Sequence, residues 1–482
     1  MSEASLENIL DIAIALTAER DMDILMSRIL TEAMNLTNCD GGTLYILTDE
    51  NALCFQNIIT RSKGISQSAA KDEIHLPPVE LNRKSVCACA ALDKAQINIP
   101  DVYASKEYDF SGAQKYDSLN QYHTKSMLVI PMKNDHDEVI GVLQLINAMD
   151  QEGNIIGFGS ECEMTVAALA SLAAISLYNH KLSEQISELL HSFVQVMAST
   201  IDLRSPYNSN HTKNIVKYGE RFIDALNQMG LAWHFTEGQK DAFLMSAWLH
   251  DIGKIVIPSH ILDKSTRLGE RIEQVMHRIE TALLMERIRG LEHPEQKSEA
   301  EERIKELLAD KTFILECNTK GSLTYEEAAR IGRLRRKRCQ NAEGEQIPLI
   351  TQEEYNALSI PRGTLTDEER RMVENHVVYT RKMLSEMRFS GEYEMTPEWA
   401  SCHHEFLDGS GYPDHKTAEE LPREVRLLTI LDIYDALTAE DRPYKPPMPS
   451  EKAFAILEDM AHNGKLDKEI LGLFLKSDAW RK

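Results

Sequence analysis

The amino-acid sequence predicts a multidomain protein in which an α+β region, a long connecting helix and an almost wholly helical region follow one another. With 482 residues, the chain is too long for one ordinary hydrophobic core. Strand-like apolar runs occur within residues 5–165, and a heptad repeat of apolar residues follows within 166–204. From residue 205 to 482, helical periodicity alternates with short polar loops.

The composition is that of a globular protein with a strong negative charge. Hydrophobic residues make up 43% of the chain, which is ordinary, and the formal net charge at pH 7 is -23. This charge argues against general binding to nucleic acid or to anionic membranes. A function on phosphates would therefore need positive charge that is concentrated locally, as metal ions or as a few Lys and Arg side chains.

Cysteines and apolar stretches predict a cytoplasmic protein. The eight cysteines include no CxxC pair and form no compact framework, so we expect reduced thiols. The acidic N-terminus has no basic segment, and no signal peptide is expected. The longest apolar stretch, residues 164–178, is shorter than the roughly 20 residues that a bilayer requires, so we predict no transmembrane segment.

The first region combines an opening helical pattern with strand-like runs. These runs read GGTLYILTDE, ALCFQNIIT, SMLVIPMKN and EVIGVLQLINA, and the last two flank NDHDE, which is typical of a hairpin turn. Helices around an antiparallel sheet make an α+β domain.

This arrangement resembles a GAF domain, a small-ligand sensory module, over most of residues 8–175. Within it, Asn147, Phe158 and Glu163 fit the signature of cyclic-nucleotide-binding GAF domains. Ala148 stands where that signature has lysine, and Cys162 stands where it has aspartate, so the expected ion pair is absent. The resemblance implies either a site for a small-molecule ligand or a GAF fold that is used only for dimerisation.

Residues 166–204 carry the pattern of a coiled-coil helix. Apolar residues and one Asn recur at alternating spacings of three and four, at Leu172, Ile175, Asn179, Leu182, Ile186, Leu189, Phe193 and Val196. With Leu172 at heptad position a, Asn179 also falls at a, which favours a parallel dimer in a fixed register. The alternative is a long helix that packs on its own domain.

The helical region is interrupted by a highly charged segment at residues 267–359. Apolar residues still recur there at helical spacing, which predicts an inserted helical subdomain rather than disorder. The run RLRRKR at residues 333–338 could bind a polyanion, or it could be a solvated helix face that nearby acids balance.

Two apolar helices of this region carry buried acidic residues. His250 and Asp251 end the nearly apolar run AFLMSAWL, and a buried Asp is costly unless it is paired or bound to a metal. Asp432 and Asp435 share one face of another apolar helix, where they would repel each other unless a cation lay between them.

Four further histidines extend this set, at His211, His376, His403 and His404. Any one of them alone would be a satisfied surface or core histidine. Together with the acids they suit a borderline divalent ion such as Fe, Mn, Ni or Zn. Because there are more candidates than one metal needs, the sequence predicts two metals that share an aspartate.

These segments resemble the HD-GYP family, the metal-dependent branch of the HD superfamily that hydrolyses cyclic di-GMP. The resemblance covers about 200–265 and 360–482 and rests on five ordered motifs, which are His211, HDIGK at 250–254, His376, HHEFLDGSGYP at 403–413 and DIYDALTAEDRPYK at 432–445. It implies an all-α domain over 205–482, with 267–359 as an insertion that the family pattern lacks. Gly411, Tyr412 and Pro413 form the loop that names the family.

The resemblance also implies a ligand set. The first metal would be bound by His211, His250, Asp251 and Asp432, and Asp251 would bridge to a second metal on His376, His403 and His404. Asp435 would support the metals or their water. Some relatives bind a third metal through a Glu at the position of Tyr207, so two metals are expected here, with Fe or Mn as first choices and Ni or Zn as alternatives.

The implied reaction is hydrolysis of cyclic di-GMP to linear pGpG, with GMP as the product of a second cleavage. Lys254 resembles the family lysine that contacts the scissile phosphate. Arg442 and Lys445 resemble residues that bind phosphates, although the spacing before them is one residue shorter than usual. The alternatives are hydrolysis of cyclic GMP-AMP, and a non-catalytic signalling scaffold with a vestigial metal site.

The expected partners follow from the same resemblance. They are cyclic di-GMP, a second copy of the chain in a parallel dimer through the GAF domain and the linker helix, and a small ligand in the GAF domain. No nucleic acid and no membrane are expected.

Overall fold

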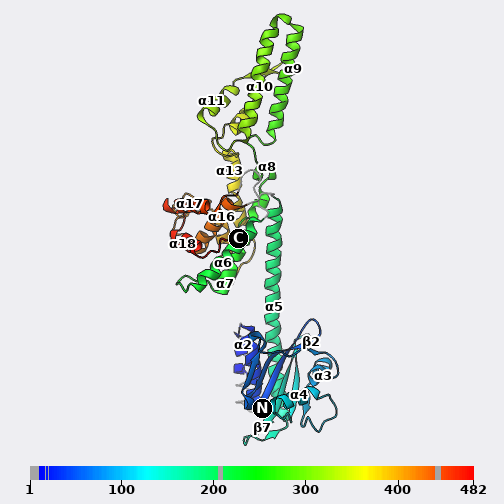
Figure 1. Ribbon diagram of the computed structural model, residues 1–482. Helices are drawn as coiled ribbons and strands as arrows, with labels where there is room; N and C mark the ends of the chain where they lie inside the picture. The colour runs from blue at the N-terminus through cyan, green and yellow to red at the C-terminus, as the bar shows by residue number, and fades with distance from the viewer. Residues whose placement is uncertain are drawn as a thin grey trace. The chain divides into compact units, whose positions relative to one another are not determined.

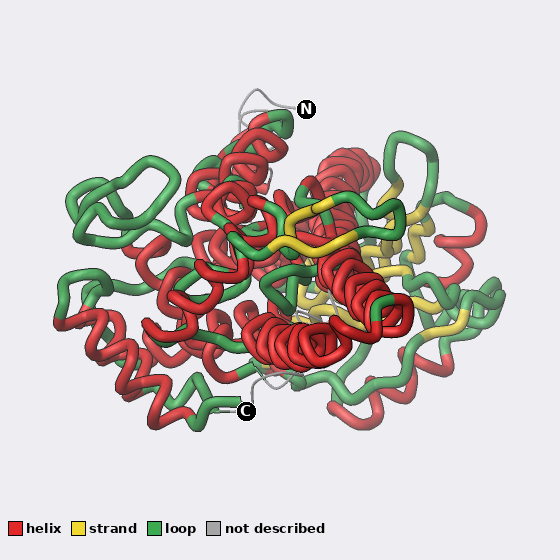
Figure 2. Tube along the Cα trace, turned by 90° about the horizontal axis from the view of Figure 1, so that it is seen from above, coloured by secondary structure: helices red, strands yellow, loops and turns green. Residues whose placement is uncertain are grey.

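The chain forms two compact units, Met1–Leu189 and Leu190–Lys482, which are described separately (Figure 1). The structure is a computed structural model, and it describes residues 10–12, 14–16, 18–19, 21–204, 210–439 and 447–481. Helices are the most frequent element, and the strands gather mainly in one sheet (Figure 2).

The first unit is built on an antiparallel sheet with the order β3-β2-β1-β7-β6-β5, in which β4 pairs with β2 and β8 with β7. Its strands are β1 (Cys39–Leu47), β2 (Ala52–Thr60), β3 (Ile65–Ser68), β4 (Val79–Glu80), β5 (Ile97–Ile99), β6 (Met127–Lys133), β7 (Val139–Met149) and β8 (Ile155–Ile156). Its helices are α2 (Met22–Thr37), α3 (Val86–Asp93), α4 (Ser111–Asn120) and the first part of α5 (Ser160–Arg204).

Side chains that alternate along the strands build two cores, one on each face of the sheet. Along β6, Leu128 and Ile130 join the core formed with α2 and α5, whereas Met127 and Val129 join the core formed with α3. The strand-like runs singled out in the sequence lie in this sheet, and the predicted α+β class is confirmed.

Helix α5 is long and apolar for a reason that lies in the first unit. Among the described residues it is the one helix that could cross a membrane by length and composition, and 44% of its apolar window is buried. Val166, Leu169, Ala173 and Leu177 belong to the core beneath the sheet. A core helix passes the same test, so the absence of a transmembrane segment stays a prediction.

The second unit is mainly helical. Its helices are the end of α5, α6 (His211–Gln228), α7 (Glu237–Leu249), α8 (Ser259–Leu262), α9 (Arg271–Glu292), α10 (Lys297–Thr319), α11 (Tyr325–Leu334), α12 (Gln352–Leu358), α13 (Asp367–Glu374), α14 (His376–Ser385), α15 (Thr396–Ser401), α16 (Arg423–Thr438), α17 (Ser450–His462) and α18 (Lys468–Lys476). A short 3₁₀ helix, η3 (Ile252–Val256), follows α7.

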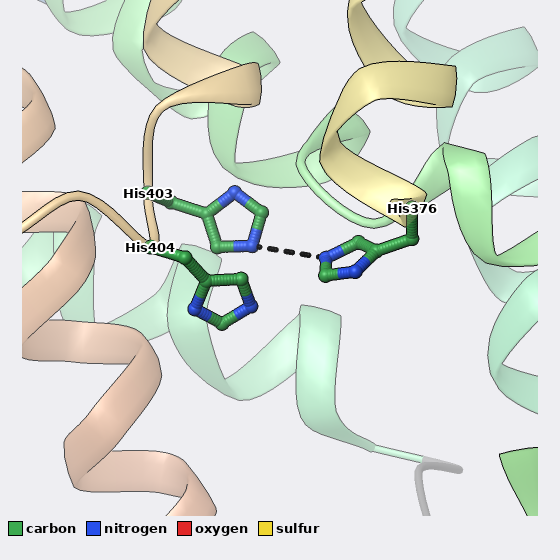
Figure 3. A group of neighbouring side chains, drawn as sticks. All are labelled: His376, His403 and His404. Atoms are coloured by element: carbon green, nitrogen blue, oxygen red, sulfur yellow. Dashed lines mark hydrogen bonds between the residues drawn. The ribbon is translucent and has the colours of Figure 1, made fainter. Parts of the chain in front are cut away.

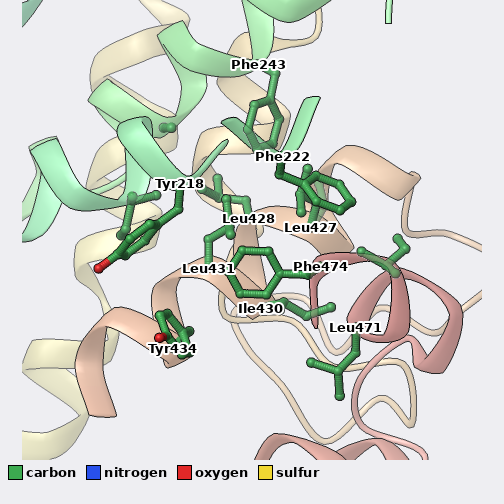
Figure 4. Close-up of a cluster of buried hydrophobic side chains, with 14 of the residues drawn as sticks. Tyr218, Phe222, Phe243, Leu427, Leu428, Ile430, Leu431, Tyr434, Leu471 and Phe474 are labelled. Carbon is green, nitrogen blue, oxygen red and sulfur yellow. The ribbon is translucent and has the colours of Figure 1, made fainter. Parts of the chain in front are cut away.

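Helix α16 runs through the centre of the main core of this unit. Leu427, Leu428, Ile430 and Leu431 leave it in several directions, among aromatic rings from α6, α7 and α18 (Figure 4). A helix that is apolar all round is buried all round. The polar residues of α16 therefore have to find partners inside the protein.

The charged segment between α8 and α13 has a core of its own. Val275 and Ile279 of α9 pack with Phe313 and Ile314 of α10 and with residues of α11 and α12. It also contains a short strand pair, β9 (Arg338–Gln340) and β10 (Gln346–Pro348), which the helical pattern did not predict. In the arginine-rich run, Lys337 pairs with Asp310 at 2.6 Å, as the charge-balanced alternative expects.

Candidate metal centre

Residues of the HD motif are held in place by a close packing of η3 against α14. A Cβ atom on Gly253 would lie 2.0 Å from the His376 carbonyl oxygen and 2.6 Å from the Thr380 nitrogen, so only glycine fits there. The Gly253 amide donates to Thr380 Oγ1 at 3.0 Å, and that hydroxyl donates to the His250 carbonyl at 3.0 Å. Thr380 thus joins the end of α7 to the start of α14, and each of these elements carries a histidine.

Asp435 orients the histidine at the start of α6. Its Oδ2 lies 2.7 Å from His211 Nδ1, and its Oδ1 accepts a hydrogen bond from Asn214 Nδ2 at 2.9 Å. The other ring nitrogen of His211 lies 3.2 Å from Asp432 Oδ1 and 3.7 Å from Asp251 Oδ2. Asp435 therefore contacts the far side of the His211 ring, while Asp432 and Asp251 share the inner side.

Three buried imidazoles have the same hydrogen-bond pattern. The Nδ1 atoms of His250, His376 and His403 each lie 2.7 Å from a backbone carbonyl three residues earlier, at Ala247, Val373 and Ala400 respectively. A proton on Nδ1 donates to that carbonyl and leaves the lone pair on Nε2, which is the arrangement of metal-ligating histidines. His376 Nε2 and His403 Nε2 lie 3.5 Å apart, and His404 lies beside them (Figure 3).

The loop after His404 is a tight structure that fixes this histidine. A Cβ atom on Gly411 would lie 2.4–2.5 Å from backbone atoms of Phe406, Glu405 and His404. Glu405 is buried and accepts hydrogen bonds from the amides of Asp414 at 2.6 Å and Lys416 at 3.1 Å. The Tyr412 ring packs on the His404 ring at a centroid distance of 4.9 Å.

Asp251 lies at the centre of the site and faces two sets of histidines. Its Oδ2 is 3.3 Å from His250 Nε2 and 3.7 Å from His211 Nε2. Its Oδ1 is 3.3 Å from His376 Nε2 and 4.0 Å from His403 Nε2. Each carboxylate oxygen therefore belongs to a different group of ligand atoms.

The electrostatics lower the pKa of Asp251 and Asp432 and lower the pKa of His403 and His404. Burial would raise the pKa of Asp251, but Lys254 and His250 hold it well below its ordinary value. Burial would also raise the pKa of Asp432, but the hydrogen bond with His211 and the nearby His404 lower it. Burial lowers the pKa of His403 and brings that of His404 to about 4.

His211 behaves differently because two carboxylates contact it. Burial would lower its pKa, but hydrogen bonds to Asp432 and Asp435 raise it from 6.5 to about 10. The proton on His211 offsets negative charge that a metal cation would neutralise instead.

The donor set fits divalent metal ions. Three groups have ligand atoms within 4.8 Å of one another, namely His376, His403 and His404; His211, His250 and Asp432; and His250, Asp251 and His403. His250 Nε2 and Asp251 Oδ1 are buried and make no hydrogen bond within the described part of the chain. Buried lone pairs without a partner are costly, and a cation between them would satisfy both.

The structure brings together most of the residues that the sequence singled out. His211, His250, Asp251, His376, His403, His404, Asp432 and Asp435 line one site, with Lys254 and the loop of Gly411, Tyr412 and Pro413 at its edge. Tyr207, Arg442 and Lys445 lie outside the described residues, so the predictions that depend on them stay predictions.

Three residues that support the site were not predicted. Asn214 and Thr380 follow His211 and His376 by three and four residues, so helical spacing could have indicated them. Glu405 adjoins the histidine pair, but the amides that it accepts from lie in a folded loop, and no sequence pattern predicts that loop.

Comparison with known families agrees with both units. Residues 21–177 match the family described as GAF domain, and residues 352–470 match the family described as HD domain. The chain contains a GAF domain and an HD domain. The matched part of the HD domain includes His376, His403, His404 and Asp432, whereas His211, His250 and Asp251 precede it and reach the same site through the fold.

Characterised relatives share the HD domain region at moderate identity. The chain is 37% identical over 122 residues to the "3'3'-cGAMP-specific phosphodiesterase 3" of Vibrio cholerae serotype O1, which is 25% of each chain. It is 36% identical over 115 residues to a "Cyclic di-GMP phosphodiesterase" of Thermotoga maritima, which is 24% of this chain and 30% of the relative. It thus spans less than a third of the length of these relatives.

Proposed function

We propose that this chain is a metal-dependent phosphodiesterase that hydrolyses cyclic di-GMP to linear pGpG, and that its GAF domain regulates this activity. The observation that carries the proposal is the position of Asp251, whose two oxygens face two separate sets of histidines. One carboxylate in this position can bridge two cations. The proposal assigns residues 5–165 to the sensory domain, 166–204 to the linker helix and 205–482 to the hydrolase, with an insertion at 267–359.

In this proposal the ligands divide between two divalent ions, with iron or manganese as the first choices. His211, His250 and Asp432 would hold one ion, and His376, His403 and His404 would hold the other. When bound, such a pair of ions supplies an activated water and neutralises charge on a phosphodiester. The imidazole lone pairs are available for this at neutral pH because burial keeps the pKa of His403 and His404 low.

Besides the proposed cations, the side chain of Lys254 contributes a positive charge to the site. Its ammonium lies 2.5 Å from Asp251 Oδ2 and is largely buried. Burial would lower its pKa, but the charge of Asp251 raises it, so the ammonium stays protonated at neutral pH. An ammonium there can donate a hydrogen bond to a phosphate oxygen or to the leaving 3′ oxygen as negative charge develops. Arg442 and Lys445 are proposed as further phosphate contacts.

A second substrate is favoured by one comparison. The relative at 37% identity is named for 3'3'-cGAMP, whereas the relative at 36% is named for cyclic di-GMP. Both substrates present the same phosphodiester, so the ligands of the metals do not distinguish them. Turnover of both dinucleotides by one preparation, measured side by side, decides between them.

The Asp251→Asn variant tests the proposed function. The amide cannot bridge two cations, so we expect metal content per chain to fall and cyclic di-GMP turnover to fall by at least about a hundredfold. Metal analysis and chromatographic detection of pGpG give the two readouts. Asp459→Asn, at an exposed position of α17, is the matched control and should keep both. Full turnover by Asp251→Asn would contradict the proposal, and metal binding by the wild type without turnover would favour a scaffold.

We also propose that the chain forms a parallel dimer through α5. Phe193 and Val196, at heptad positions a and d, are 57% and 65% exposed, and Ile186 and Leu189 extend the same apolar stripe. Asn179 continues the heptad as its polar position. A second copy of the chain has the same stripe and would cover it.

A further inference from the structure

The last four turns of α5 have two different faces. Val194 and Ile201 are buried against Met245 and Leu249 of α7 in a small core, and Leu190 and Met197 pack on the same core. The residues of the heptad stripe, such as Phe193 and Val196, lie on a different face of the helix and are exposed. This part of α5 is therefore joined to the hydrolase unit through one face and leaves the other face free for a partner.

Arg204 ends α5 and binds the segment that follows the HD motif. One terminal nitrogen, Nη1, donates to the carbonyls of Lys254, at 3.1 Å, and Ile255. The other, Nη2, donates to the carbonyl of Ile257 at 2.7 Å. A planar guanidinium can hold several carbonyls at once in a fixed geometry, which a lysine ammonium cannot match.

Besides Arg204, the bound segment is held by the backbone hydrogen bonds of η3, from Lys254 N to the Asp251 carbonyl at 2.9 Å and from Ile257 N to the Lys254 carbonyl at 3.1 Å. Gly253 is fixed on α14 through Thr380, and Ile257 is buried. Between them, Ile255 and Val256 are 48% and 49% exposed, so apolar burial contributes little there. Lys254 leaves this stretch and places its ammonium on Asp251.

The same turn of α5 also reaches the other side of the site. Asp202 is buried and accepts a hydrogen bond from Thr212 Oγ1 at 2.9 Å, next to His211. A shift of the end of α5 would therefore move the neighbours of His211 and of Lys254 at the same time.

We propose that Arg204 is a positioning residue for the reaction: by fixing the carbonyls of Lys254, Ile255 and Ile257 to the end of α5, it sets the position of the Lys254 ammonium relative to Asp251. This inference rests on the proposed function, in which Lys254 contacts the scissile phosphate. It gives α5 a direct route by which the position of the linker helix changes the rate of hydrolysis.

The test compares Arg204→Gln, Arg204→Lys and the control Arg388→Gln, an exposed arginine of the same unit. We expect Arg204→Gln to lower kcat by about tenfold or more, with KM and metal content nearly unchanged, because the lysine is misplaced rather than removed. Arg204→Lys should recover part of the loss, and Arg388→Gln should match the wild type.

A double-mutant cycle separates positioning from general damage. In a Lys254→Ala background, Arg204→Gln should cause no further loss, because the group that it positions is gone. Losses that multiply in the double variant would overturn the proposal. So would a loss of metal with the single variant Arg204→Gln.

Hydrogen exchange gives a readout that does not depend on activity. Amides of residues 253–257 should exchange faster in Arg204→Gln than in the wild type, while Arg388→Gln leaves them unchanged. If the wild type turns over no cyclic dinucleotide, the proposed function fails. Unchanged exchange at residues 253–257 would, independently of activity, remove the structural basis of the positioning role of Arg204.

Discussion

Gly411 shows how single residues of this site are fixed by the backbone and not by side-chain chemistry. The space that a Cβ atom would occupy is filled by backbone atoms of His404, Glu405 and Phe406, which cannot rotate away. The loop is therefore closed directly on the residues that carry His404. Gly253 has the same role at the HD motif, where the neighbouring backbone belongs to α14.

Gly411→Ala should disturb both the fold and the site. We expect the free energy of unfolding of the second unit to fall by about 3 kcal/mol, because backbone has to move to relieve contacts of 2.4–2.5 Å. Denaturant unfolding measures this change. Gly472→Ala is the matched control, because a Cβ atom there would meet no atom within 4 Å beyond its own stretch of α18, and the change should be neutral or stabilising. Equal stability of the two variants would contradict the packing argument.

The raised pKa of His211 predicts that metal binding releases a proton. Its pKa of about 10 means that protein stripped of metal carries this proton at pH 8, and a cation bound to Nε2 must displace it. The apparent metal affinity should therefore increase as the pH rises towards 10, instead of levelling off above 7.

Titration of the stripped protein with Mn²⁺ at pH 8, in weak buffer with a pH indicator, measures this release. We expect His211→Ala to release about one proton fewer than the wild type. Equal release from both proteins would show that His211 is neutral before the metal binds.

At the scale of elements, α5 contributes to the cores of both units and also carries an exposed apolar stripe. Its first turns complete a core of the GAF unit, its last turns pack on α7, and its apolar stripe is exposed. An apolar stripe with heptad spacing is a feature of helices that pair.

Phe193→Glu and Val196→Glu together should separate the proposed dimer. In a parallel pair the new carboxylates would face each other at positions a and d, where like charges repel in a poorly hydrated seam. We expect sedimentation to change from that of a dimer to that of a monomer, whereas Gln195→Glu, at an exposed position beside the stripe, should stay dimeric. A wild-type monomer at micromolar concentration would contradict the dimer proposal.

The elements of this fold were predictable to different degrees, for identifiable reasons. The run ALCFQNIIT coincides with β2, and the turn NDHDE joins β6 to β7, because short apolar runs and turn residues are local signals. The pair β9 and β10 has three residues in each strand, too few to produce a pattern. The contacts of Arg204 and Gly253 join segments that are far apart in the sequence, and no local signal encodes them.

Part of the candidate site was predictable because burial of acidic residues in apolar helices requires an explanation. The charges of Asp251 and Asp432 indicated a cation. The sequence could not reveal that the two oxygens of Asp251 face different histidines, because this depends on how α6, α7, α14 and α15 meet.

At the scale of the whole molecule, the two ends of the inserted subdomain lie beside each other. Lys264 lies beside the start of α13, where its carbonyl accepts a hydrogen bond from Thr364 Oγ1 at 2.9 Å and its ammonium pairs with Glu369 at 2.6 Å. Within the subdomain, Arg267 is fully buried and donates to the carbonyls of Cys317, Lys320 and Ile360. The chain therefore enters and leaves the subdomain at neighbouring points.

Replacing residues 266–362 with a short Gly-Ser linker should leave the metal centre intact. None of the proposed ligands lies in that range, and the subdomain has its own core, so we expect metal content equal to that of the full chain and turnover within about threefold. Metal analysis and the cyclic di-GMP assay measure both. A rise of more than tenfold would instead identify the subdomain as a cover over the site, and loss of metal would identify it as a support.

The carbonyl partners of His250, His376 and His403 have a consequence for how freely this protein can change. Each imidazole lies within hydrogen-bond distance of a backbone carbonyl three residues earlier, and these carbonyls belong to α7, α13 and α15 respectively. Substitution of a neighbouring side chain cannot delete such a bond, as it could if a carboxylate supplied it. The orientation of these rings therefore does not depend on which side chains surround them, and residues around the proposed metal ligands can be substituted without removing these hydrogen bonds.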